Sequence, residues 1–489
     1  MNEFIVSLML LGAVGSSDGQ LPYWATTNQY GLMPESTGVL ALVRARTEFD
    51  DTKTLQWRWG TSLAANGNLI SGDRSIAVRQ PYHLMADELY ASLRWQCFTI
   101  DAGMKRRGQD FLAADESLGS LSVTGGHMTE SGNSRTMPGY LITLEPLAVP
   151  FTGSHLWIYG SYGDYRTLDT RYVQDALVHR MKAYARIDFN DRLSLTLGLD
   201  HYGLWAGDSP DNPPIYITLE NYWRIITGRS GGADASLSDR INVLGDHGGS
   251  ELIRFDYRGD GWKAEFQHEI PYADRSGMKF RNFPDGVNTM HFGFDDKDRW
   301  VSDILYEYHY TMFQSGSING ESYDSQGHPL HPEGTWIYGG DNYYNNAYYR
   351  SGWTHFGRPT GDPLFFPEGT KDGTWTSDRL VKGLENTRFK AHHFALSGKL
   401  WRKHPYKLML TYSMNHGTYG EPYAGESQWQ KEWGTVKETG LPQFSAAFTG
   451  SLHKLFGVSG LIGIYGLYYD CGKVLPSNFG LTLGLKYTL

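Results

Sequence analysis

The chain has 489 residues and a formal net charge of −9 at pH 7. Its mean hydropathy of −0.44 excludes a bundle of transmembrane helices, because each such helix needs roughly 20 mostly apolar residues. The acidic balance argues against a nucleic-acid partner, since that binding relies on Lys and Arg to neutralise phosphates. The 58 glycines, 32 tyrosines and 15 tryptophans favour a fold with many turns and little helix.

The chain starts with an apolar run, FIVSLMLLGAVG, over residues 4–15, and small and polar residues follow it to residue 20. The run has the length of the apolar part of a secretory signal peptide, although only Asn2 and Glu3 precede it, after the initial Met, and no positive charge does. We therefore expect a signal peptide over residues 1–20 and a single domain over residues 21–489. A short buried strand is the alternative for this run.

Apolar and polar residues alternate along many segments of the chain. In LSLTLGLD, Leu193, Leu195, Leu197 and Leu199 share one face of a strand and the polar residues share the other. Aromatic residues gather at the ends of such segments, as in a membrane barrel with an apolar outer band, two aromatic girdles and a polar interior. The same period of two recurs in residues 55–59, 181–189, 306–312 and 406–415.

The chain ends inside a strand pattern, FGLTLGLKYTL, over residues 479–489. An exposed flat edge invites aggregation, whereas a barrel pairs its last strand with its first and has no edge. Gly-, Asn- and Pro-rich stretches over residues 208–214 and 315–335 predict loops between strands. The fold class is therefore all-β: a single closed antiparallel transmembrane β-barrel with extracellular loops, for which the length supplies about 16 to 18 strands.

Particular stretches resemble the capsule assembly Wzi family of outer-membrane barrels. The clearest is GGDNYYNNAYYRSGWTHFGRPTGDPLF over residues 339–365, and the resemblance covers nearly all of residues 21–489. Four further stretches agree in order: residues 21–32, 118–140, 268–286 and 386–400.

The resemblance implies an outer-membrane barrel of about eighteen antiparallel strands that binds capsular or extracellular polysaccharide. Such a protein helps to assemble or anchor the polysaccharide at the cell surface and acts as a lectin, not as an enzyme. The implied partners are the polysaccharide and outer-membrane lipid, with other capsule-assembly proteins left open, and we expect a monomer. No cofactor is expected.

Catalytic and metal sites find little support in the sequence. His392 and His393 are adjacent, so on a strand they point to opposite faces and cannot share an ion. The acidic stretch FDDKDRW, over residues 294–300, lacks the glycine and distal glutamate of a calcium loop and is interpreted as a solvated turn. The chain contains no H-E-x-x-H, Walker A or G-x-S-x-G motif. We expect no metal and no catalytic residue, and an outer-membrane hydrolase stays the least supported alternative.

A general or sugar-specific porin is the stronger alternative, because barrel size alone favours it. Porins and lectins differ in the lumen, and bulky side chains predicted to face inward, Tyr184, Arg186 and Glu307, would help to fill it. We therefore expect no large ion conductance. The two cysteines, Cys97 and Cys471, indicate neither a disulfide framework nor a compartment.

Residues 339–358 are the densest in groups that recognise sugars. Aromatic rings stack on the apolar faces of sugars, fixed polar groups bind hydroxyls, and arginine pairs with the carboxylate of an acidic sugar. Two structural alternatives stay open: the aromatics form an interfacial girdle, or Arg358 pairs with Asp341 or Asp362 in the lumen. The candidate glycan-binding residues are Asp341, Asn342, Tyr343, Tyr344, Tyr348, Tyr349, Trp353, His355 and Arg358.

Overall fold

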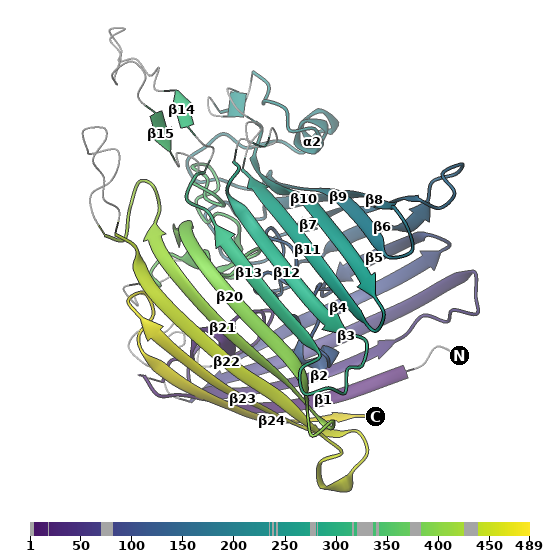
Figure 1. The fold of residues 1–489 in the computed structure, drawn as a ribbon. Coiled ribbons are helices and arrows are strands. Elements are labelled where there is room, and N and C mark those ends of the chain that lie inside the picture. Colours follow the sequence, from purple (N-terminus) through teal and green to yellow (C-terminus); the bar gives the residue numbers. More distant parts are fainter. Residues whose placement is uncertain are drawn as a thin grey trace.

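The computed structural model describes residues 4–489 apart from 18, 70–81, 234, 237–238, 241–242, 274–279, 281, 315–316, 320–335, 339–341, 372–382 and 425–438. Eighteen strands form one closed antiparallel sheet, which confirms the predicted β-barrel (Figure 1). Its strands are β1 (Phe4–Gly15), β2 (Gly38–Thr47), β3 (Leu55–Asn68), β4 (Tyr82–Trp95), β5 (Phe98–Met104), β6 (Gly139–Ala148), β7 (Leu156–Arg166), β8 (Leu177–Asp188), β9 (Leu193–Trp205), β10 (Asp246–Gly259), β11 (Trp262–Tyr272), β12 (Gly286–Phe294), β13 (Asp303–Tyr310), β20 (Arg388–Leu400), β21 (His404–Gly417), β22 (Leu441–His453), β23 (Leu461–Gly472) and β24 (Asn478–Thr488).

The barrel closes where the first and last strands meet. Strand β1 pairs with β2 on one side and with β24 on the other, in a register that places Ser7 opposite Thr488. Figure 1 shows the purple β1 and the yellow β24 side by side, with the two chain ends at the same end of the barrel. The C-terminal strand therefore has a partner on both edges, as its pattern predicts.

Strand β1 consists of the apolar run near the start of the chain. Residues 4–15, interpreted as part of a signal peptide, here form a strand of the barrel wall that pairs with β2. The expected boundary at residue 20 stays a prediction. The run is apolar on both faces for a physical reason. Leu8 and Leu10 are exposed on the outside, while Leu11 and Ala13 are buried inside against other apolar side chains.

The alternation along the strands separates two environments, as predicted. On β9, Leu197 and Leu199 are exposed, whereas Thr196 and Asp200 are buried in the interior. Strand β24 repeats the pattern, with Leu483 exposed on the outer face. A closed wall with an apolar outer band is stable in lipid, because all its backbone groups are paired between strands.

The connections at the two ends of the barrel differ in length. Short connections, such as residues 189–192 and 260–261, join strands at the end where both chain termini lie. Long connections, such as residues 105–138, 206–245 and 311–387, join strands at the other end. These are called the short-connection end and the long-connection end. The predicted loop at 208–214 lies in a long connection, and most of the loop predicted at 315–335 lies outside the described residues.

Three inward segments occupy the lumen, and together they are called the plug: residues 20–37, 105–138 and 343–371. The second segment extends towards the short-connection end, where the N–H of Ala114 donates to Ser397 of β20 and Asp115 lies 3.0 Å from His453 of β22. The buried side chains of the plug join those of the wall in one hydrophobic core inside the barrel. No helix of the described residues is long and apolar enough to cross a membrane. The elements outside the barrel wall are α1 (Tyr23–Thr26), α2 (Leu219–Ile226), the 3-10 turns η2 (Glu116–Leu118) and η5 (Leu455–Gly457), and three small hairpins: β14 (Ser317–Asn319) with β15 (Trp336–Tyr338), β16 (Thr354–His355) with β17 (Arg358–Pro359), and β18 (Phe366–Pro367) with β19 (Leu384–Asn386).

Candidate functional site

Carboxylates of the barrel wall hold the second plug segment by its backbone. Glu307 of β13 accepts a hydrogen bond from the backbone N–H of Val123 at 2.8 Å. Glu269 of β11 accepts one from the backbone N–H of Met128, with both carboxylate oxygens 3.0 Å from the nitrogen. Both glutamates are buried. These bonds satisfy backbone groups that a loop inside a barrel would otherwise leave without a partner.

A buried arginine holds the third plug segment. Arg171, in the connection between β7 and β8, donates to the backbone carbonyls of Thr354 and Gly352, each at 2.9 Å. Its neighbour Asp169 accepts a hydrogen bond from the backbone N–H of Phe356 at 2.9 Å. A long connection thus clamps residues 352–356 inside the lumen.

The aromatic residues of the predicted glycan site lie inside the plug. Each of the five is 7% exposed or less, so the structure places them in the lumen and not in an interfacial girdle. Trp353 packs edge-on against Tyr202 of the wall, with 6.0 Å between ring centroids. The tyrosine hydroxyls donate to protein oxygens: Tyr343 to Asp285, Tyr344 to the carbonyl of Met128, Tyr348 to the carbonyl of Pro213 and Tyr349 to the carbonyl of Ala206. Burial gives these side chains a role in holding the plug, and their contact with glycan stays a prediction.

His355 is fully buried, and both ring nitrogens have partners. Burial lowers the pKa of His355 to about 4, so the ring is neutral at pH 7. In the tautomer that fits, Nδ1–H donates to the carbonyl of Arg135 at 3.0 Å and Nε2 accepts from the N–H of Leu168 at 3.1 Å. His355 therefore ties the second and third plug segments to a long connection.

Two further polar candidates, Asp341 and Asn342, come directly before the third plug segment in the chain. The side-chain oxygen of Asn342 accepts hydrogen bonds from Thr387 at 2.8 Å and from the amide of Asn345 at 3.1 Å. Asp341 lies outside the described residues.

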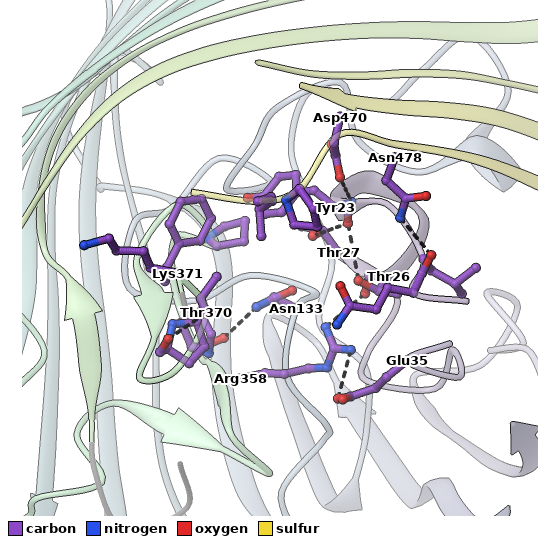
Figure 2. Close-up of a pocket in the computed structure, with 18 residues that line it drawn as sticks. Tyr23, Thr26, Thr27, Glu35, Asn133, Arg358, Thr370, Lys371, Asp470 and Asn478 are labelled. Carbon is purple, nitrogen blue, oxygen red and sulfur yellow. Dashed lines mark hydrogen bonds and ion pairs between the residues drawn. The ribbon is translucent and has the colours of Figure 1, made fainter. Parts of the chain in front are cut away.

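Arg358 is the predicted residue that lines the pocket of Figure 2. Its guanidinium donates to the carbonyl of Thr26 at 3.2 Å and lies 3.7 Å from a carboxylate oxygen of Glu35. The expected partner Asp362 instead binds His309, 2.7 Å away. The pocket has a volume of about 110 Å³ and is lined by Gln20, Leu21, Tyr23, Thr26, Thr27, Glu35, Asn133, Arg358, Pro359, Pro363, Phe366, Pro367, Thr370, Lys371, Asp470, Leu475, Pro476 and Asn478.

The pocket combines charged, polar and apolar groups. One carboxylate oxygen of Glu35, Oε2, is buried and accepts no hydrogen bond within the protein. Burial and the nearby charge of Arg358 lower the pKa of Arg135 to about 10, which still leaves Arg135 charged at pH 7. Phe366 and several prolines add flat apolar surface. These groups suit a ligand that presents both hydroxyls and apolar C–H faces.

Sequence reasoning missed most of this pocket, because its residues come from distant parts of the chain. Glu35 and Asn133 lie on the first two plug segments, and Asp470 and Asn478 on the last two strands. Residues 21–32 and 118–140, which resemble the Wzi family, end near Glu35 or include Asn133. The resemblance therefore points to these parts of the chain, but it assigns no contact to either residue.

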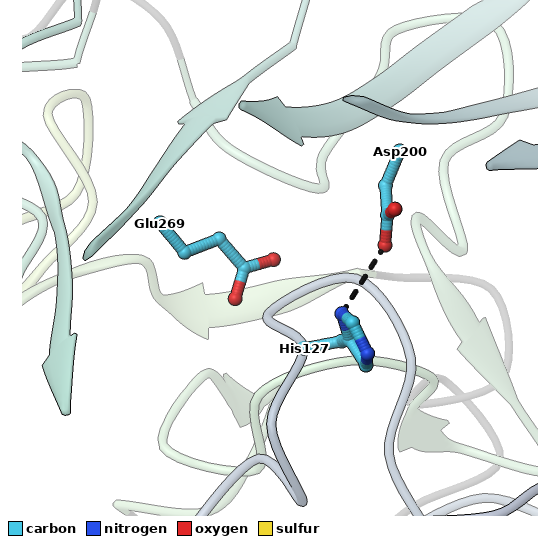
Figure 3. Close-up of side chains that lie close together, drawn as sticks. All are labelled: His127, Asp200 and Glu269. Atoms are coloured by element: carbon cyan, nitrogen blue, oxygen red, sulfur yellow. Dashed lines mark ion pairs between the residues drawn. The ribbon is translucent and has the colours of Figure 1, made fainter. Parts of the chain in front are cut away.

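One group among the described residues has the composition of a metal site: His127, Asp200 and Glu269, whose ligand atoms lie within 4.8 Å of one another (Figure 3). A cation already neutralises it, because Lys182 Nζ lies 3.0 Å from the carboxylate of Asp200. His127 Nδ1 is 3.4 Å from the same carboxylate oxygen. Burial and the charge of Lys182 lower the pKa of His127, but Asp200 and Glu269 outweigh them and raise it overall. The trio is therefore best described as an ion-pair network that joins the plug to the wall.

A larger cavity of about 870 Å³ lies towards the short-connection end. The strand side chains Tyr184 and Arg186 line it, as expected for lumen-facing residues, but they leave space open there. Residues of the short connections, including Gly153, Asn190 and Arg192, also line it. Glu307 is instead buried against the plug.

No family model matches the chain, and no curated protein does. Among solved structures, it is similar to Wzi of Escherichia coli, described as an outer-membrane protein involved in group 1 capsule assembly and as a carbohydrate-binding β-barrel. The TM-score is 0.52 at 12% identity, over 98% of this chain and 83% of that one. It also matches OccK9 (OpdG) of Pseudomonas aeruginosa, with a TM-score of 0.47 at 12% identity over 100% and 98% of the chains, and OccAB4 of Acinetobacter baumannii, with 0.44 at 10% over 100% and 98%.

The protein is an outer-membrane β-barrel. Its eighteen strands close on themselves, and the exposed side chains of the wall form an apolar band that requires lipid. In barrels of this kind the short connections face the periplasm and the long ones face the outside. The pocket of Arg358 therefore lies towards the cell surface, and the larger cavity lies towards the periplasm.

Proposed function

We propose that this barrel binds capsular or extracellular polysaccharide and helps to assemble or anchor it at the cell surface, as a member of the Wzi family would. The observation that carries the proposal is the pocket of Figure 2, which lies on the outward side of the lumen. The carbohydrate binding described for the Wzi structure supports it by likeness of fold. We propose further that the protein acts as a monomer without a cofactor.

The lining of the pocket supports a sugar ligand in three ways. Glu35 offers an acceptor for a sugar hydroxyl, since its Oε2 has no protein partner. Arg358 and Lys371 supply positive charge for an acidic substituent. Phe366 and the prolines offer apolar surface on which a ring face can stack. The volume of about 110 Å³ is small, so we propose that the pocket holds one residue or one substituent of a longer chain.

The experiment is a binding assay with purified capsular polysaccharide and the barrel in detergent. The double variant Glu35→Gln with Arg358→Ala should bind less polysaccharide while keeping the heat-modifiable migration of a folded barrel. The matched control is Glu265→Gln with Arg186→Ala, which removes the same charges at the periplasmic cavity. Equal binding by both variants and the wild type contradicts the proposal. Released sugar in the same assay would favour a hydrolase.

The porin alternative rests on one observation, the cavity of about 870 Å³ at the periplasmic end. A porin needs a continuous water-filled path, whereas the buried core of the plug occupies part of the lumen. We therefore expect no large steady conductance from the barrel in planar bilayers. Stable channels on the nanosiemens scale would overturn this expectation and favour the porin.

A further inference from the structure

Helix α2 lies outside the barrel, against the outer face of the wall at the long-connection end (Figure 1). Its Ile225 is fully buried, and the side-chain positions of Gly203 and Gly245 point at it. Its Tyr222 packs on Trp205 of β9, with 5.6 Å between ring centroids. The helix begins at Thr218, whose hydroxyl accepts a hydrogen bond from the N–H of Asn221.

The helix covers polar groups on the face of the wall that elsewhere meets lipid. His179, His201 and His247, from three adjacent strands, point outward and are 2% exposed or less. The hydroxyl of Tyr222 donates to the carboxylate of Asp164 at 2.6 Å. Such groups are costly in hydrocarbon unless they are covered, so α2 is held at the edge of the apolar band.

The barrel contacts fix which side of α2 faces the wall. The hydroxyl of Tyr222 forms a hydrogen bond with the hydroxyl of Tyr162. Tyr162 lies opposite Met181 on the next strand, and Met181 lies opposite His201, so the three residues form one row across the wall. Ile225 reaches Gly203, which lies two residues nearer the long connections on the same strand as His201. Tyr222 also binds Asp164, which lies in the row of His179 and Gly203, and it packs on Trp205. The side of α2 that carries Tyr222 and Ile225 therefore faces the wall, and the opposite side faces away from the barrel.

The solvent-accessible half of α2 is divided into two sectors. At 3.6 residues per turn, Leu219, Trp223 and Ile226 lie on the side of Tyr222. Leu219 is 89% exposed and Trp223 is 56% exposed. Glu220 and Arg224 lie on the opposite side and form an ion pair with each other at 2.6 Å. The preceding Tyr216 and Ile217 are also exposed.

We infer that α2 is an interfacial helix that binds the lipid of the outer leaflet. Its apolar sector, Leu219, Trp223 and Ile226, continues the lipid-facing band beyond the strands, and the pair Glu220–Arg224 faces the aqueous side. A helix with adjacent apolar and charged sectors lies in the plane of the membrane surface in this way. The helix thereby anchors the 206–245 connection and shields the outward histidines.

The test places one environment-sensitive fluorophore on each sector of the full-length barrel. The native cysteines, Cys97 and Cys471, are both free and are replaced by serine. Single cysteines are then introduced as Leu219→Cys, Trp223→Cys and Glu220→Cys, labelled with NBD and reconstituted in phosphatidylcholine–phosphatidylglycerol vesicles with and without brominated acyl chains. Leu197→Cys, on the lipid-facing band of β9, is the positive control.

We expect the labels at 219 and 223 to be blue-shifted and to lose emission in brominated vesicles to an extent comparable with the label at 197. The label at 220 should keep its emission. Unquenched, water-like emission at both 219 and 223 overturns the inference, because the helix would then stand in solvent. Equal quenching at 219, 220 and 223 overturns it too, since the helix would have no aqueous side. Heat-modifiable migration of each variant establishes that the barrel is folded.

Discussion

Two arginine–aspartate pairs show how differently the two ends of the lumen use charge. In each pair the residues are two positions apart: Arg171 with Asp169 near the cell surface, and Arg186 with Asp188 near the periplasm. The side chain of Arg171 is 2% exposed and that of Arg186 is 34% exposed. Arg171 uses its other donors to bind plug carbonyls, whereas Arg186 faces a cavity. In these two pairs, charge fixes structure at the outward end and is partly solvated at the inward end.

The largest expected effect comes from breaking the buried pair. Arg171→Ala leaves Asp169 buried without its cation and removes two hydrogen bonds from the plug, which costs about 3–5 kcal/mol. Arg186→Ala should cost at most about 1 kcal/mol, because its pair is solvated. Urea unfolding in lipid vesicles measures both values. Similar losses in the two variants would show that the two ends do not differ as described.

A second prediction compares the two faces of β9, one of which faces the cavity at the inward end while the other faces lipid. Leu195→Arg places a charge on the lipid-facing side of β9 and should reduce stability by about 2–4 kcal/mol. Thr196→Arg places the same charge beside the cavity of about 870 Å³, where there is room and water, and should have little effect. Folding yields of the two variants in vesicles test this prediction, and equal yields would mean that the faces are assigned wrongly.

Much of the wall could be predicted from sequence, but the plug could not. Whether a wall residue faces lipid or the lumen follows from the period of two along its strand. On β9, for example, Leu197 is exposed and Asp200 is buried. The plug depends on contacts between distant residues, such as Val123 with Glu307, that no local pattern reports. Strand β1 lacks the polar half of the pattern because its inner face meets the plug core.

The candidate site was predicted only in part. Arg358, whose contact with glycan stays a prediction, lines the same pocket as Glu35, which the sequence did not single out. The tyrosines suggested an exposed binding surface because composition alone does not distinguish stacking platforms from a buried core. Helix α2 was also missed, although Thr218 ahead of Leu219 is a typical residue to start a helix.

Mild acid provides a third way to test the plug end. The folded pKa of His355, about 4, lies below its ordinary value near 6.5. The neutral ring therefore stabilises the fold fully above pH 6.5, and this contribution is lost as the pH falls towards 4. At pH 5 the loss should be about 2 kcal/mol. Proteolytic sensitivity of the plug between pH 7 and 5 measures it, and His355→Asn, which does not titrate, should show a smaller change.

The smallest expected effect tests a single wall contact. Glu307→Gln keeps the shape of the side chain but replaces charge-assisted hydrogen bonds to Val123 and Thr289 with weaker ones. We expect a loss of about 1 kcal/mol and faster hydrogen exchange at the Val123 amide. Unchanged exchange there would show that the carboxylate does not hold this part of the plug.

The junction of β1 with β24 sets the order in which the molecule can be built. It pairs Ser7 with Thr488, so the wall closes only through contacts between opposite ends of the chain. Contacts of such large sequence separation form slowly. The third plug segment belongs to the same hydrophobic core as Leu11 and Ala13 of β1. The plug must therefore enter the lumen before β1 pairs with β24. Slow docking of the plug would delay insertion of the whole barrel.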